Sequence, residues 1–149
     1  MTEPSFPSEL EHLIEFYAED VDFALLNEVD VSLWLKSVLK SENAELDSVT
    51  YIFCTDDYLL NINQTYLKHD DLTDIISFPY NRNPVEGDIF ISIERATENA
   101  STFQVTQTDE IHRLLVHGML HLVGYDDKTT ESKSKMTELE NLYLSQRTF

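Results

Sequence analysis

The sequence predicts an α/β (α+β) fold in which about five helices cover a small β-sheet, formed by a single domain over residues 1–149. Three observations support this prediction. A length of 149 residues suffices for one hydrophobic core without disulfides. The hydrophobic fraction of 42% and the aromatic fraction of 11% are those of ordinary globular proteins. Strand-like and helix-like segments follow in the order β-α-β-α-β-β-α-α-α, which is typical of a sheet covered by helices.

The first half of the chain is expected to hold two strands and two helices. Residues 13–17 and 49–54 are rich in β-branched and aromatic side chains, which favour strands. Asp30 is expected to cap the helix between these strands, and Thr55 to cap the helix after the second strand. Apolar residues at helical spacing define the inward faces of both helices. They are Val31, Trp34, Leu35 and Val38 in the first helix, and Leu59, Ile62 and Tyr66 in the second.

The second half is expected to hold two strands followed by three helices. Residues 74–79 form a strand that Pro79 stops before a turn-rich stretch, and residues 87–93 form the next strand. A helix follows at about 94–104. Thr106 and Asp109 fit a capping box that starts another helix, and the last helix covers about 130–144. The expected inward residues are Ala96, Ala100 and Phe103 in the first of these helices, and Met136, Leu139, Leu142 and Tyr143 in the last.

The composition restricts the classes of function. Ten Lys and Arg against 28 Asp and Glu give a net charge of −18, which opposes long-range attraction to nucleic acids or anionic membranes. No apolar run approaches ~20 residues, so no membrane span is expected. The N-terminus lacks the features of a signal peptide. Cys54 is the only cysteine, which favours a reducing cytoplasm, and its apolar surroundings predict a small buried side chain rather than a nucleophile.

The most informative stretch, residues 117–127, reads His-Gly-Met-Leu-His-Leu-Val-Gly-Tyr-Asp-Asp. His117 and His121 are four residues apart and therefore lie on one face of a helix. Gly124 is the residue type that ends a helix with a positive φ, and a reversing chain can bring Asp127 back towards the two histidines. This spacing is that of metzincin-type zinc hydrolases. Asp126 could supply the carboxylate instead, but the spacing from Gly124 favours Asp127 as the ligand, and Asp126 as a turn residue or as a group that supports a ligand from outside.

These ligand types favour a catalytic zinc site over a structural one. Two nitrogens and one oxygen leave a fourth position for a water molecule, which zinc activates near neutral pH. The metal-bound water is the only catalytic group that the sequence assigns. Gly118 stands where an H-E-x-x-H peptidase places its general base, which disfavours peptidase chemistry. Gly118 is expected to leave room beside His117 for a substrate backbone or another helix.

The chain resembles the YbeY family of bacterial metal-dependent endoribonucleases in three stretches. The family motif H-G-x-L-H-L-x-G-Y-D-H is matched from His117 through Asp126, with Asp127 in place of the last histidine. The sequence T-D-I-I-S-F-P at 73–79 resembles the family's T-D-V-L-S-F-P strand, and G-D-I-F-I-S at 87–92 resembles its G-D-I-x-I-S strand. The resemblance therefore covers roughly residues 50–127.

This resemblance implies a specific fold and activity. The fold would be a four-stranded, mostly parallel sheet covered by helices, with one Zn²⁺ ion held by His117, His121 and Asp127. The activity would be hydrolysis of single-stranded RNA, in late 3′-end maturation of small-subunit (16S) ribosomal RNA and in ribosome quality control. Ribosomal RNA would be the main partner, and the negative charge favours basic ribosomal proteins as further partners.

Two positions depart from the family pattern. Asp127 replaces a histidine, which keeps zinc competence but makes the site harder and more anionic. Leu67 stands where the family usually carries an arginine that meets the RNA backbone. Lys68 is the nearest cation and is therefore the candidate substrate-binding residue, with Arg82 as a more distant one.

Two other functions stay open. The first is a ribosome-assembly binding factor whose zinc site supports weak or no nuclease activity, which the missing arginine and the acidic charge favour. The second is a hydrolase of peptides or other small substrates, to which Gly118 is the main objection.

Four other titratable residues complete the sequence-based expectations. His112 is expected to be packed or exposed rather than catalytic, and Glu110 to cap its helix rather than to support a ligand. His69 and His12 have no motif around them and are expected at the surface.

Overall fold

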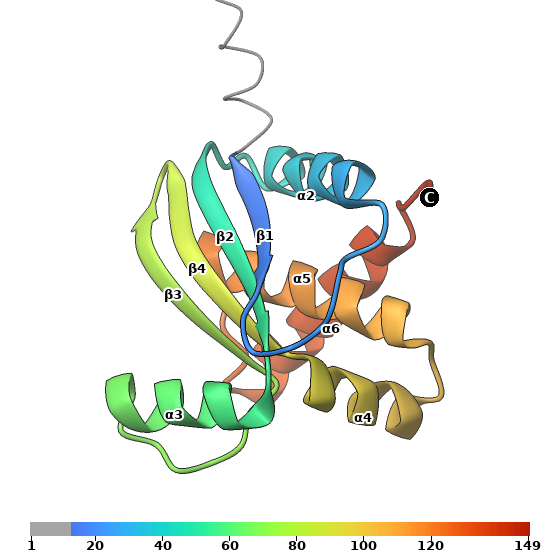
Figure 1. Ribbon diagram of the computed structural model, residues 1–149. Coiled ribbons are helices and arrows are strands. Elements are labelled where there is room, and N and C mark those ends of the chain that lie inside the picture. Colours follow the sequence, from blue (N-terminus) through green and yellow to red (C-terminus); the bar gives the residue numbers. More distant parts are fainter. Residues whose placement is uncertain (1–12) are drawn as a thin grey trace, which may run out of the picture.

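A four-stranded mixed sheet forms the centre of the computed structural model, which describes residues 13–149 (Figure 1). The strands lie in the order β1-β2-β4-β3. β1 pairs in parallel with β2, and β2 in parallel with β4, whereas β3 pairs antiparallel with β4. Their bounds are Ile14–Ala18 for β1, Leu46–Cys54 for β2, Ile75–Arg82 for β3 and Val85–Ser92 for β4. β1 and β3 are therefore the two edges of the sheet.

Five helices of the described chain cover this sheet. α5 is the central one: it lies across one face, with α2 and α6 packed around it in the main hydrophobic core (Figure 1). α3 contributes to a second, smaller apolar cluster with β3 and β4. The bounds are Glu28–Ser41 for α2, Asp56–Tyr66 for α3, Ile93–Phe103 for α4, Gln107–Val123 for α5 and Thr130–Leu144 for α6. None of these helices is long and apolar enough to cross a membrane.

The predicted fold class and order of elements are confirmed, and so is the burial of most predicted apolar faces. Cys54 is buried and free as expected, and burial raises the pKa of its thiol to about 12. Three predicted inward residues are wrong, because they are largely exposed. Tyr66 and Phe103 are the last residues of their helices, where the chain turns away from the core, and Leu142 lies beside the buried stripe of α6.

Two predicted element boundaries are also wrong. Asn27, rather than Asp30, precedes the first turn of α2, and Asp30 lies inside that turn, where a negative charge favours the helix dipole. Pro79 does not end its strand, because β3 continues to Arg82. Proline is tolerated there because β3 is an edge strand, where a missing N–H breaks no ladder on the open side.

Gly118 lets α5 approach the sheet closely. A Cβ atom at this position would lie 2.8 Å from Cγ2 of Ile89 on β4 and 3.1 Å from Cδ1 of Ile75 on β3. The space beside His117 is therefore occupied by the sheet, and the expectation of a substrate backbone or a helix there is wrong. The close approach places the last turns of α5, with both histidines, next to the edge strand β3.

We expect Gly118→Ala to lower the free energy of unfolding by about 1–2 kcal/mol, measured by urea denaturation. Overpacking costs about 1–3 kcal/mol, and alanine returns up to about 1 kcal/mol of helix propensity. The nearest carbon atom belongs to Ile89, so the same substitution should cost less in an Ile89→Ala background. An equal cost in both backgrounds would contradict this explanation.

Candidate metal centre

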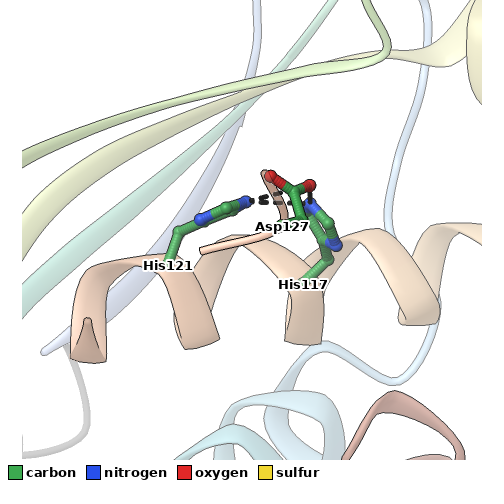
Figure 2. A group of neighbouring side chains, drawn as sticks. All are labelled: His117, His121 and Asp127. Atoms are coloured by element: carbon green, nitrogen blue, oxygen red, sulfur yellow. Dashed lines mark hydrogen bonds and ion pairs between the residues drawn. The ribbon is translucent and has the colours of Figure 1, made fainter. Parts of the chain in front are cut away.

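The end of α5 brings three candidate ligands together (Figure 2). His117 and His121 lie on its last two turns, and Gly124 ends the helix with φ 119°. The Gly124 amide donates to the carbonyls of Leu120 and His121, at 3.1 and 3.0 Å. This cap reverses the chain and returns Asp127 over the face of the helix that carries the imidazoles, as the sequence predicts.

The three side chains point their ligand atoms at one another. The two Nε2 atoms of His117 and His121 are 3.0 Å apart. Oδ2 of Asp127 lies 3.4 Å from Nε2 of His117 and 3.6 Å from Nε2 of His121. One ligand atom from each residue lies within 4.8 Å of the others, so the group could hold a metal ion.

Hydrogen bonds at the opposite ring nitrogens set the tautomers of both histidines. Nδ1 of His121 lies 2.9 Å from the carbonyl oxygen of Tyr125, which can only accept, so this nitrogen carries the proton. Nδ1 of His117 lies 2.6 Å from Oε2 of Glu140. In the neutral form of each ring, Nε2 therefore presents its lone pair towards Asp127. Two lone pairs and a carboxylate oxygen repel at these distances unless a cation or a shared proton lies between them, and this donor set fits Zn²⁺.

Glu140 was missed by the sequence analysis, although it supports a predicted ligand. Its side chain is 4% exposed and lies 3.2 Å from Nη1 of Arg113. Arg113 in turn pairs with Glu110, whose side chain is 1% exposed, so the guanidinium faces two buried carboxylates. A signal for Glu140 was present in the sequence. It stands four residues after Met136, on the apolar stripe that predicts the buried face of α6.

Glu110 has a different role from the one predicted. Thr106 caps α5, accepting from the Asp109 amide at 3.0 Å, while Glu110 lies buried and bonds Arg113. Asn99 extends the network, because its Nδ2 lies 3.2 Å from Oε2 of Glu110 and 3.0 Å from Oδ2 of Asp74. A chain of polar contacts thus runs from behind His117 to the start of β3.

A cleft of about 610 Å³ opens onto the three candidate ligands. Its walls are the loop between α3 and β3, the first half of β3, and His117, His121 and Asp127. Asn63 holds the loop in place, because its buried amide donates to the Asp71 carbonyl at 2.8 Å. The cleft therefore gives a substrate access to the three candidate ligands.

The described residues that line this cleft include no Lys or Arg. Leu67 and His69 contribute to its wall, whereas Lys68, between them, is exposed and does not line it. The guanidinium of Arg82 packs by the end of α5, since a Cβ on Gly124 would lie 3.0 Å from its Cζ atom. Neither cation that the sequence offers for substrate binding reaches the cleft wall.

The remaining histidines are accounted for, apart from His12, which lies outside the described residues. His69 is exposed, as predicted, but its side of the loop faces the cleft. His112 is buried, as predicted for a packed residue, between the rings of Trp34 and Phe149 at centroid distances of 5.6 and 5.5 Å. Burial, together with Arg147, lowers the pKa of His112 to about 4.

The chain is similar to several known proteins. Residues 14–148 match the family described as Endoribonuclease YbeY. Among curated proteins, Endoribonuclease YbeY of Cytophaga hutchinsonii is 44% identical over 141 residues, covering 93% of this chain and 99% of that protein. The Flavobacterium psychrophilum protein of the same name is 46% identical over 123 residues, covering 82% and 88%. The solution structure of TM1509 from Thermotoga maritima superposes with a TM-score of 0.65 at 28% identity, over 89% of this chain and 87% of that one.

We expect Asp127→Ala to weaken zinc binding by at least about 100-fold. Removing a residue that only hydrogen-bonds a ligand typically lowers metal affinity about 10- to 100-fold, and removing a ligand itself should cost more. Asp126→Ala is the matched control. Asp126 is exposed and its Oδ1 accepts from the Lys128 amide at 3.2 Å, as a turn residue does. Competition with a chromogenic chelator measures both affinities. A larger effect at Asp126 would move the third ligand.

We expect His112 to make stability depend on pH. Its folded pKa of about 4 lies below its unfolded value of 6.5, so the unfolded chain binds the extra proton first as the pH falls. The stabilisation is therefore complete above pH 6.5 and is lost towards pH 4, by up to about 3 kcal/mol. Urea denaturation of metal-free protein across this window measures it. His112→Asn, which keeps an acceptor for Arg147, should flatten the slope, and an unchanged slope would contradict the assignment.

Proposed function

The chain belongs to the YbeY endoribonuclease family, and we propose that it is a zinc-dependent, single-strand-specific endoribonuclease. We assign it to late 3′-end maturation of 16S ribosomal RNA and to ribosome quality control in the cytoplasm. The site residues in this proposal are His117, His121 and Asp127, which hold one zinc ion.

The observation that carries the proposal is the convergence of two imidazole Nε2 atoms and one carboxylate oxygen at the mouth of an open cleft. A bound zinc ion would supply Lewis-acid chemistry to a phosphodiester and to water. The chain's own residues prepare the site for it. Glu140 and the Tyr125 carbonyl hold a proton on each Nδ1, which keeps both Nε2 atoms free as ligands.

A second function is supported by a different observation. The cleft wall has no Lys or Arg among the described residues, and Leu67 lies in it where the family usually carries arginine. Phosphate contacts by cations normally supply much of the affinity for RNA. A ribosome-assembly factor with a zinc site but weak nuclease activity is therefore the alternative. In that case the net charge of −18 favours contacts with basic ribosomal proteins.

The decisive experiment combines metal analysis with RNA cleavage. We expect purified protein to hold one zinc ion and to cleave a single-stranded fragment of 16S ribosomal RNA, but not the same sequence in a duplex. His117→Ala should lower both zinc content and cleavage, the latter by at least about 100-fold, because it removes a ligand.

Three results separate the possibilities. Cleavage that persists in metal-free His117→Ala protein would refute the metal-dependent mechanism. Bound zinc without cleavage, together with unprocessed 16S 3′ ends in cells that lack the protein, would favour the assembly factor. Equal cleavage of single-stranded and duplex RNA would refute the strand specificity.

A further inference from the structure

The wall of the cleft contains a polar group that the fold itself does not use. Two buried side-chain oxygens in the described part of the chain lack a hydrogen-bond partner, Oγ of Ser32 and Oγ of Ser77. Ser77 lies on β3 and lines the same cleft as His117, His121 and Asp127. An unpaired buried hydroxyl lowers the stability of the folded state, so its presence beside a functional site calls for a partner from outside the chain.

The main chain of β3 presents further unpaired groups along this wall. The Ser92 amide donates to the Asp74 carbonyl at 3.0 Å, and Ile75 and Ser77 lie opposite Ile91 and Ile89. Hydrogen-bonded pairs alternate with non-bonded pairs in an antiparallel ladder, so the N–H and C=O groups of Ile75 and Ser77 point away from β4. β3 is the edge of the sheet, and these groups therefore face the open side. The 3.3 Å contact from Thr73 Oγ1 to the Ile75 carbonyl agrees with this direction.

The charged side chains on the cleft wall do not favour a polyanionic substrate, so the neutral groups of β3 matter for binding it. The titratable side chains on the cleft wall, apart from the two histidine ligands, are His69, Asp71, Asp74 and Asp127. No Lys or Arg lines the described cleft, so this wall offers no cationic side chain to pair with phosphates. Apart from a bound metal ion, hydrogen bonds from uncharged donors are the means by which this wall can hold a strand.

We propose that the open edge of β3 binds single-stranded RNA by uncharged hydrogen bonds, through the outward amides of Ile75 and Ser77 and through the Ser77 hydroxyl, which reaches the strand once its side chain rotates about χ1 towards the cleft. The proposal rests on the proposed function and names the substrate-binding wall of that site. The edge suits RNA better than an added peptide strand. Pro79 has no N–H, so the run of outward donors ends at Ser77 and is too short for a ladder.

Two consequences distinguish this role from a structural one. Ser77→Ala removes an unpaired hydroxyl, so it should not lower the melting temperature or the zinc content, yet it should weaken RNA binding on the order of tenfold. The salt dependence of binding should also be shallow. A slope of log Kd against log[salt] below about 1.5 corresponds to no more than about two phosphate contacts on a single strand.

The test uses the full-length, zinc-loaded protein and a fluorescent single-stranded fragment of 16S ribosomal RNA. Anisotropy gives Kd and its salt slope, and cleavage assays give KM and kcat. Ser32→Ala is the matched control. It removes the other buried, unpartnered hydroxyl, which lines a groove between β1 and α2. We expect Ser77→Ala to raise Kd and KM with little change in kcat, and Ser32→Ala to change neither.

The outcomes decide between the proposals. Unchanged RNA binding by Ser77→Ala, a loss of zinc or melting temperature in that variant, or a salt slope above about 3 would overturn the inference. RNA that binds wild type more tightly than Ser77→Ala, without being cleaved, would support the inference while refuting the nuclease function. No RNA binding by wild type would overturn both. A peptide strand that pairs along β3 and excludes RNA would assign the edge to a protein partner and overturn the inference.

Discussion

The close approach of α5 to the sheet at Gly118 is the constraint on which the rest of the site depends. The missing side chain lets the helix rest on Ile89 and Ile75, which sets the height of His117 and His121 above the start of β3. The cleft lies between the last turns of α5, the first half of β3 and the loop that precedes β3. A glycine in a helix interior weakens the helix, so its use here is explained by packing rather than by helix formation.

A buried charge network supports the same helix from behind. Glu110, Arg113 and Glu140 are largely withdrawn from water, and such groups stabilise a fold only when all of them are paired. This network orients His117, because the carboxylate of Glu140 is hydrogen-bonded to Nδ1 of His117. His121 is oriented by a main-chain carbonyl instead. The candidate ligand His117 is thus fixed by long-range packing of α6, and the candidate ligand His121 by the local cap that also positions Asp127.

This difference explains what could be predicted from the sequence. The last turns of α5, their glycine cap and the three candidate ligands lie within residues 117–127, so local spacing alone predicts that these side chains come together. Glu140 reaches the site through tertiary packing, which no spacing within residues 117–127 encodes. The end of β3 also depends on tertiary structure, because β3 is an edge strand. Pro79 ends a strand by local rules, but β3 continues because its outer side carries no ladder.

The net charge of −18 does not by itself exclude an RNA substrate, because binding also depends on the groups that line the cleft. Net charge governs long-range attraction, whereas recognition at contact depends on the groups that line the wall. In the described cleft the polar groups are carboxylates, one histidine besides the two candidate ligands, the Asn63 side chain, the hydroxyl residues Thr73 and Ser77, and the main chain of β3. Carboxylates on the wall repel phosphates but favour a divalent cation, so a bound metal ion would be the principal positive charge that a strand meets there. Binding of RNA and binding of metal should therefore be coupled more tightly than in a site that cations line.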